Sequence, residues 1–266
     1  MAISAKDVMG LRQRTGLGMM DCKKALTETS GDVDAAIELL RKKLKGKMEE
    51  RSDRDTTEGI VAVAKSPGAI AMIELTCETD FVARNEAFSE AATKIAQMAL
   101  EGADGPIEAT DEMKQLVEDL KITIQENISL RQGVRLSGST LGSYVHHNHK
   151  IGVVIKADGE IPETLLTGVC QHICAAVPTP LAVDESSLPP EELDRQRTAA
   201  INEAKASGKP EQIAEKIATG KLRKWVDENT LMGQIYLREL DAKKPVRDYL
   251  SKDMAIKSFF RYRLGG

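Results

Sequence analysis

The chain of 266 residues has only four cysteines and no long hydrophobic run. No apolar stretch approaches the roughly 18 residues that a membrane-spanning helix needs. The segment from Met1 to Arg14 is too polar for a signal peptide. We therefore expect a cytoplasmic protein that contacts no membrane, with its cysteines present as reduced thiols rather than disulfides.

An excess of charge of one sign is also missing. The formal net charge is −4, with 29% charged and 41% hydrophobic residues, an ordinary composition for a globular protein. This argues against binding dominated by phosphate contacts, so we expect no nucleic-acid partner. The basic run from Arg41 could be a nucleic-acid patch, but acidic residues follow it up to Asp55. It is better interpreted as a solvated helix end and linker.

Sequence motifs that would mark an enzyme are missing as well. Gly16-Leu17-Gly18 lacks the spacing and the lysine of a phosphate-binding loop, and the stretch from Ser137 to Ser143 lacks the G-x-S-x-G order. Cys170, His172 and Cys174, with the histidine-rich loop His146–His149, leave a metal site conceivable, but their spacing matches no compact zinc pattern. Buried structural thiols are the better interpretation. We therefore predict no catalytic residue, no metal and no cofactor.

The first fifty residues predict three short helices. Ser4 is expected to cap the first helix, and the glycines of Arg14–Gly18 to end it. The second helix is expected over Met19–Thr29, and Ser30-Gly31-Asp32 separates it from the third, which starts at Val33. Such a bundle has little core of its own, so we expect a small satellite domain.

From Thr56 onwards the pattern indicates alternating hairpins and helices. Two apolar runs around Ser66-Pro67-Gly68 predict a β-hairpin, followed by helices. The same order then recurs in the second part of the chain, which predicts two related subdomains, each an antiparallel sheet covered by helices. The expected segments are strands 59–64 and 69–77, helices 85–100 and 111–127 (capped by Asp111), strands 141–145 and 151–157, and a helix over 162–177.

A helical hairpin is expected over 186–229, with its turn at Ser207–Pro210. Its two arms carry a narrow apolar seam, so the hairpin can pack mainly on itself and project. The seam residues are Leu193, Ala200, Ile201, Ala204, Ile213, Ile217, Leu222 and Val226. Beyond the hairpin, Ile256, Ser258, Phe260, Tyr262 and Leu264 alternate with other residues at the period of a final strand.

The fold class that we predict is α+β. The expected parts are an N-terminal helical domain with linker (1–50), a first core subdomain (56–140), a second core subdomain (141–185 and 230–264) and the inserted hairpin (186–229).

Aromatic residues are scarce, at 3% of the chain, and one of the four Phe has an unusual position. Phe81 stands beside Asp80 in the turn Glu78–Val82, where the second strand should pass into a helix. One interpretation is that the ring is presented to a partner at a loop tip. The other is that it folds back as a lid on its own helix.

Two successive methionines are a second candidate contact. Met19 and Met20 open a helix and point about 100° apart, so at least one of them should be exposed. An exposed Met makes an adaptable apolar contact.

Two strings together resemble the signatures of the elongation factor Ts family. They are LRQRTGLGMMDCKKAL at Leu11–Leu26 and ELTCETDFVAR at Glu74–Arg84, and Gly142–His146 and Ile151–Val153 also resemble the second core subdomain of that family. Its members are guanine-nucleotide exchange factors for elongation factor Tu. They have a ubiquitin-associated-like helical domain, two related α/β core subdomains and often a projecting coiled-coil hairpin. The resemblance therefore implies a non-enzymatic factor of protein biosynthesis that binds elongation factor Tu in its GDP-bound and nucleotide-free forms.

The resemblance also implies roles for single residues. Arg12, Met19 and Met20 would contact a helix of the GTPase domain. The turn residues Thr79, Asp80, Phe81 and Val82 would disturb the magnesium site of the GTPase, and His146 would lie at the second-subdomain contact.

Three departures from the family pattern affect these expectations. Thr76 stands where the family usually has Asn, which questions a hydrogen bond that supports the turn. Arg131-Gln132 replaces the more familiar Arg-Arg pair, and this sequence ends at Gly265-Gly266 where some members continue into a helix that touches the GTPase. A homodimer and a purely structural helper of a GTPase both stay open.

Overall fold

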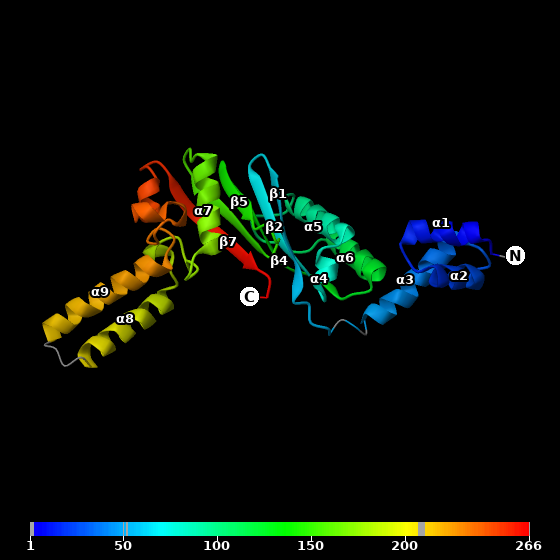
Figure 1. Ribbon diagram of the computed structural model, residues 1–266, viewed down its shortest axis with the longest axis horizontal. Helices are drawn as coiled ribbons and strands as arrows, with labels where there is room; N and C mark the ends of the chain where they lie inside the picture. Colours follow the sequence, from blue (N-terminus) through cyan, green and yellow to red (C-terminus); the bar gives the residue numbers. More distant parts are fainter. Residues whose placement is uncertain (1–2, 50, 52, 207–210, 266) are drawn as a thin grey trace.

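The computed structural model describes residues 3–49, 51, 53–206 and 211–265. The predicted turn at 207–210 and the last glycine of the chain lie outside these residues. The molecule is elongated, with helices α1, α2 and α3 at one end, two sheets in the middle and the hairpin α8–α9 at the other end (Figure 1). The predicted α+β fold is confirmed. Among the described helices, none is both long and apolar enough to cross a membrane.

The N-terminal helical bundle consists of α1 (Ala5–Thr15), α2 (Met19–Glu28) and α3 (Val33–Glu49). Ser4 caps α1 in a capping box with Asp7, as predicted for the cap, and Gly16 takes the left-handed conformation, with φ 69°, that ends the helix. The bundle closes around a small core of residues from all three helices and from the loop between α1 and α2. These are Val8, Leu11, Leu17, Cys22, Ala25, Leu26, Ala36, Leu40 and Leu44.

The bundle also contacts the rest of the molecule. Ile122 of α6 (Asp111–Ile124) packs against the bundle core. The Arg41 guanidinium lies 3.5 Å from the Asp119 carboxylate of the same helix. The helix α3 takes up most of the charged stretch that the sequence assigns to a helix end and linker, which lets this contact form.

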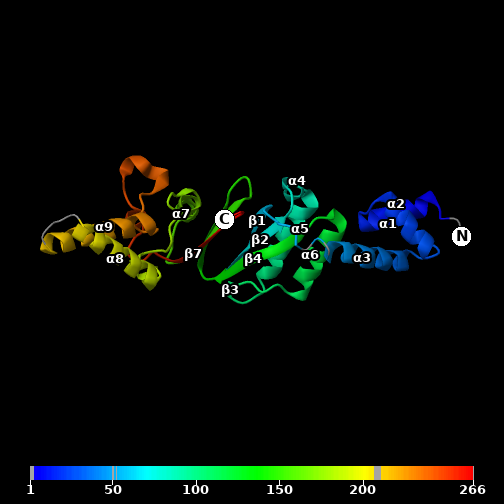
Figure 2. The same ribbon diagram turned by 90° about the horizontal axis from the view of Figure 1, so that it is seen from below.

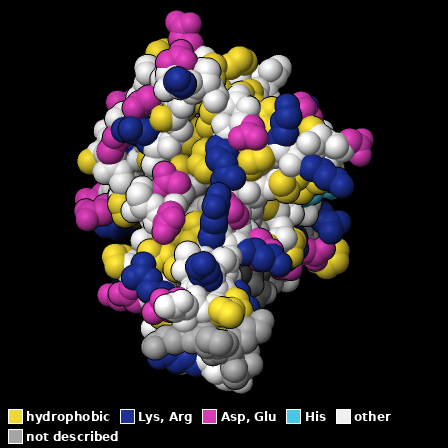
Figure 3. Space-filling view, turned by 90° about the vertical axis from the view of Figure 1, so that its left-hand side faces the viewer, with side chains coloured by type: hydrophobic (Ala, Val, Ile, Leu, Met, Phe, Trp, Pro, Cys, Tyr) yellow, Lys and Arg dark blue, Asp and Glu magenta, His cyan; other side chains and the backbone are white. Residues whose placement is uncertain are grey.

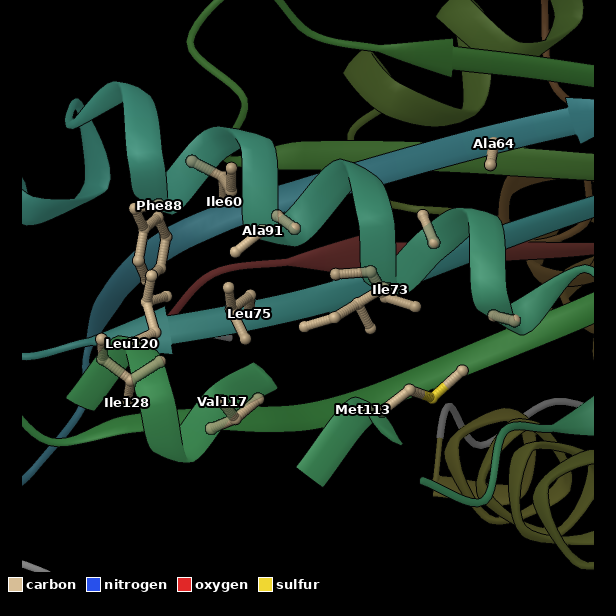
Figure 4. Close-up of a cluster of buried hydrophobic side chains, with 14 of the residues drawn as sticks. Ile60, Ala64, Ile73, Leu75, Phe88, Ala91, Met113, Val117, Leu120 and Ile128 are labelled. Atoms are coloured by element: carbon tan, nitrogen blue, oxygen red, sulfur yellow. The ribbon is translucent and has the colours of Figure 1, made fainter. Parts of the chain in front are cut away.

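The first sheet has the strand order β1-β2-β4-β3 and is antiparallel throughout. Its strands are β1 (Glu58–Ser66), β2 (Ala69–Cys77), β4 (Ile128–Ser137) and β3 (Gly105–Pro106). The predicted hairpin is confirmed, whereas β4 and β3 are additions. Helices α5 (Glu86–Ala99) and α6 cover one face of this sheet, around Phe88, Ile73 and Leu120 (Figure 4). The cap of α6 is Thr110 and not Asp111, because the Thr110 hydroxyl accepts from the Met113 N–H.

The second sheet has the order β5-β6-β7 and is covered by α7 (Glu163–Ala175). Its strands are β5 (Thr140–Val145), β6 (Ile151–Asp158) and β7 (Ala255–Arg263). The predicted alternation in β7 is wrong at its start. A register shift opposite Lys156/Ala157 places Ile256 on the α7 side together with Phe259, while Phe260 and Tyr262 face the other sheet.

The two sheets pack against each other through their inner faces. Val61, Ile70, Met72, Val134, Leu136 and Val154 form this shared core, with Phe260 and Tyr262 at its side. Gly152 is needed for the close approach, because a Cβ there would lie 2.4 Å from the Val61 side chain. The sheets are also joined by a hydrogen bond from the Val61 N–H to the His149 carbonyl (2.7 Å).

The hairpin helices α8 (Pro190–Ala206) and α9 (Glu211–Asn229) pack on each other and project from the body (Figures 1 and 2). The seam is made mainly of alanines, which are Ala200, Ala204, Ala214 and Ala218. Ile213 is 47% exposed, so its assignment to the seam is wrong. At the hairpin end of the molecule, basic and acidic side chains lie interspersed on the visible face (Figure 3).

The remaining helical segments among the described residues are short. They are the 3₁₀ turns Glu185–Ser187, Leu237–Ala242 and Val246–Tyr249 and the single-turn helix α4 (Asp80–Ala83).

Candidate functional site

The turn after β2 presents one aromatic ring to solvent. Phe81 is 84% exposed, although the ring of Phe88, seven positions later, is fully buried in the core. The interpretation of Phe81 as a lid on its own helix is therefore wrong. Val82, the next residue of α4, is half-buried and packs against the core cluster. Successive helical positions point about 100° apart, so Val82 anchors the turn while Phe81 projects from it.

Asp80 precedes Phe81 in the turn and forms an ion pair with a nearby arginine. Its carboxylate is 2.9 Å from the Arg84 guanidinium, four residues later on the same surface. The Arg84 side chain is 80% exposed and that of Asp80 44%, so solvent screens the pair. An ion pair of this i,i+4 kind contributes only about 0.3–0.5 kcal/mol. The Asp80 carboxylate can therefore exchange Arg84 for a partner's group at little cost.

Thr76 does not support the turn. Its hydroxyl lies 2.9 Å from the Thr56 hydroxyl and 3.2 Å from the carbonyl oxygen of Ser129. The support comes instead from Glu126, whose carboxylate accepts from the N–H groups of Glu78 and Thr79. Sequence reasoning missed Glu126. The available signal was a carboxylate two residues before β4, but that strand was itself not predicted.

The turn and the histidine-rich loop lie side by side. A cleft of about 450 Å³ is lined by Asp80, Ala83 and Arg84 on one side and by 147–150 on the other, with Glu58 between them. The Lys150 ammonium is 2.7 Å from the Glu58 carboxylate. This ion pair joins the loop before β6 to the start of β1. The fold thus brings together the two core regions that the resemblance singles out, although they are far apart in the sequence.

His146 sits at the base of this loop and is half-buried. Its Nδ1 atom lies 3.2 Å from the Tyr144 hydroxyl, and its ring contacts that of His147 with centroids 4.2 Å apart. His147 and His149 are exposed, as expected for a hairpin loop. His146 itself does not line the cleft. Its backbone N–H donates to the Ile151 carbonyl (2.9 Å), and its carbonyl accepts from the His149 N–H (2.8 Å), which ties the loop to the end of β5.

The third group of predicted contact residues lies on the N-terminal helical bundle. Met19 and Met20 are 52% and 64% exposed, so both of them face solvent, and Arg12 is exposed as well. Met9 adds a further exposed methionine on α1 that the sequence pattern did not indicate. This surface is separate from the cleft, because the bundle lies beyond α6 (Figure 1).

The reactive groups of the chain are packed as structural side chains. All four cysteines are free and buried. Burial, followed by the negative charge of Glu126, raises the pKa of Cys77 to about 12, and burial raises that of Cys170 to about 12. Thiols with such pKa values are not nucleophiles at neutral pH. Within the described residues, no three His, Cys, Asp or Glu side chains are grouped to hold a metal.

His172 is buried on α7, where its Nε2 atom lies 2.9 Å from Gln234 Oε1 and its Nδ1 accepts from the Leu237 N–H. Burial lowers the pKa of this imidazole, so it is held neutral. A cavity of about 670 Å³ borders His172 at the base of the hairpin. It contains none of the residues that the resemblance implies for partner contact.

Comparisons with known proteins agree with this arrangement. A family profile described as Elongation factor TS matches residues 78–266, which is more than half of the chain. The chain is 40% identical over 280 residues to an elongation factor Ts of Thioalkalivibrio sulfidiphilus (strain HL-EbGR7), covering 100% of this chain and 93% of that protein. It is 37% identical over 278 residues to an elongation factor Ts of Hydrogenobaculum sp. (strain Y04AAS1), covering 100% of both.

Proposed function

This chain belongs to the elongation factor Ts family, and we propose from that premise that it releases GDP from elongation factor Tu. Family membership makes it a translation elongation factor. The finer proposal is that it acts as a guanine-nucleotide exchange factor without catalytic residues of its own. The observation that carries it is the exposed ring of Phe81 beside Asp80, on a turn fixed to the end of a buried strand.

The physical basis is competition between the exchange factor and the ligands of the GTPase. GDP and Mg²⁺ hold each other there, because the ion requires near-octahedral oxygen ligation and neutralises phosphate charge. We propose that the turn Thr79–Val82 disturbs this site, with Phe81 as an apolar wedge and Asp80 as an added negative charge. A protein that binds the empty GTPase more tightly than the loaded one weakens nucleotide binding by the same factor.

Other surfaces hold the partner in place. Arg12, Met19 and Met20 are proposed to contact a helix of the GTPase domain, and His146 to contact it from the second sheet. The exposure of both methionines supports the first contact. The position of His146 at the base of the loop that borders the cleft supports the second. We further propose that the parts predicted at 1–50, 56–140, 141–185 with 230–264, and 186–229 are the domains of the protein.

The test is release of a fluorescent GDP from elongation factor Tu, followed with this protein present at substoichiometric amounts. We expect multiple turnovers and suppression by high free Mg²⁺, because the ion opposes its own loss by mass action. A structural helper that binds the GTPase without opening it would give complex formation but no faster release. That outcome would reject the exchange function and leave only the family's role in elongation.

A further inference from the structure

We propose that Glu126 is the positioning residue of the Glu78–Val82 turn, holding it in the conformation from which Phe81 and Asp80 meet the GTPase. The role in exchange rests on the proposed function, whereas the role in holding the turn can be measured on the protein alone. Glu126 lies in the connection between α6 and β4 and is half-buried.

Three donors of the turn converge on the Glu126 carboxylate. Its Oε2 atom accepts from the N–H groups of Glu78 (3.2 Å) and Thr79 (3.1 Å). Its Oε1 atom accepts from the Thr79 hydroxyl at 2.6 Å. An ionised carboxylate accepts all three bonds at once, and bonds to a charged acceptor are the strong class of hydrogen bond.

The contact continues into the helix that carries Phe81. The Thr79 hydroxyl donates a hydrogen bond to Glu126 and accepts one from the Val82 N–H at 3.4 Å, which caps α4. The carboxylate therefore sets the hydroxyl in the orientation that the cap needs. Because Phe81 lies between Thr79 and Val82, the two bonds fix the backbone on either side of its ring.

Hydrogen bonds between the turn and the segment at Glu126 run in both directions. The Glu78 carboxylate accepts from the Asn127 N–H at 2.7 Å, so residues 78–79 and 126–127 hold each other. The Arg54 guanidinium, 3.0 Å from the other oxygen of Glu78, ties the chain leading from the N-terminal helical bundle to the same point. This explains how the turn is supported while Thr76 bonds elsewhere.

The ring itself cannot define its own position. Phe81 is 84% exposed, so little packing within the chain orients it, and its direction depends on the backbone of the turn. Loss of the Glu126 bonds should therefore spread the ring over several directions before binding. Ordering a mobile side chain on binding costs conformational entropy. This cost falls on the step in which the Phe81 ring inserts into the GTPase.

The experiment compares Glu126→Ala and Glu126→Gln with the control Glu118→Ala. The Glu118 carboxylate lies on α6, 2.7 Å from the Lys121 ammonium and away from the turn. Amide hydrogen exchange at Glu78 and Thr79 is measured first, without any partner. For Glu126→Ala we expect exchange roughly tenfold faster at these two amides, since hydrogen bonds to a charged group are removed. Glu126→Gln keeps one acceptor oxygen and should recover part of the protection, while Glu118→Ala should match the wild type.

Steady-state exchange kinetics on elongation factor Tu then separate positioning from stability. For Glu126→Ala we expect kcat about five- to tenfold lower with KM changed by less than about twofold, and partial recovery in Glu126→Gln. Unchanged amide exchange at Glu78 and Thr79 would overturn the positioning role whether or not the protein releases GDP. Altered amide exchange with unchanged kcat would overturn the link between the turn's conformation and exchange. A wild type that fails to release GDP would reject the proposed function while leaving the amide measurement valid.

Discussion

Replacement of Phe81 by Ala should separate function from stability. In the free protein the ring is 84% exposed, so the substitution removes almost no contact from the fold. Surface substitutions of this kind usually change the free energy of unfolding by less than about 0.5 kcal/mol. The matched control is Phe88→Ala on α5, because the Phe88 ring is fully buried in the first-sheet core (Figure 4). That variant should lose about 3–5 kcal/mol of stability.

The expected loss of activity follows from the same exposure. Because nearly the whole ring is free in solution, nearly all of its apolar area is available for burial in the partner. Full burial of a Phe side chain contributes about 1.5–3 kcal/mol, which corresponds to about a 10- to 150-fold loss of kcat/KM in Phe81→Ala. If the ring acts as a wedge, kcat should fall by more than the initial docking to GDP-bound elongation factor Tu weakens.

The assay pairs thermal or urea unfolding with fluorescent-GDP release on the same preparations. Phe81→Ala should unfold like the wild type and exchange slowly, while Phe88→Ala should be destabilised and exchange normally per folded molecule. A Phe81→Ala variant that is strongly destabilised, with normal exchange per folded molecule, would refute the reasoning. The ring would then be a packing residue.

Three further outcomes are expected. Joint replacement of Met19 and Met20 by Ala should weaken binding to elongation factor Tu by about 1–2 kcal/mol in calorimetry, as loss of exposed contacts at a relevant interface does. Deletion of Met1–Lys45 should weaken binding further and leave the sheets folded by circular dichroism, with only a small loss of stability where Ile122 is uncovered. His172 should contribute stability that is present above its ordinary pKa of 6.5 and is lost as pH falls towards its lowered folded pKa, since the unfolded state takes up the proton first. The resulting change in the free energy of unfolding cannot exceed about 1.4 kcal/mol per pH unit. Urea unfolding near pH 7.5 and near pH 5.5 should show a smaller change between the two pH values in His172→Gln than in the wild type.

The parts of the fold that local patterns determine could be predicted from the sequence. The N-terminal helices, both hairpins and the projecting hairpin each depend on spacing, caps and turn residues, and they lie where these indicate. The sequence did not predict β4, because polar residues in it interrupt the two-residue alternation of apolar side chains that is typical of a strand. Arg131 and Gln132 face the buried Glu74 carboxylate, with Gln132 Nε2 2.6 Å and Arg131 Nη1 3.5 Å from it. Only the tertiary pairing of β2 with β4 shows that these polar groups belong inside a sheet.

The same distinction explains the errors in side-chain placement. Helical spacing assigned Ile213 to the hairpin seam, but two closely packed helices favour the smaller Ala214 and Ala218 at the contact. A single register shift places Ile256 and Phe260 on opposite faces of the sheet. No local sequence pattern indicates such a shift. For Phe81 the local sequence allowed two opposite orientations, and only the packing of its neighbour Val82 decides between them.

The joined sheets determine how the proposed contacts act together. Reversal of a 1:99 distribution between two states of the GTPase requires roughly 5.5 kcal/mol of differential affinity, more than the burial of one Phe supplies. The remainder has to come from contacts that are formed at the same time as the turn engages. The Val61–His149 hydrogen bond and the Lys150–Glu58 ion pair attach the histidine-rich loop to the strand β1 that lies under the turn. A GTPase that docks on the loop is therefore held at a fixed distance from Phe81. Binding energy from contacts with the second sheet can then contribute to the weakening of nucleotide binding.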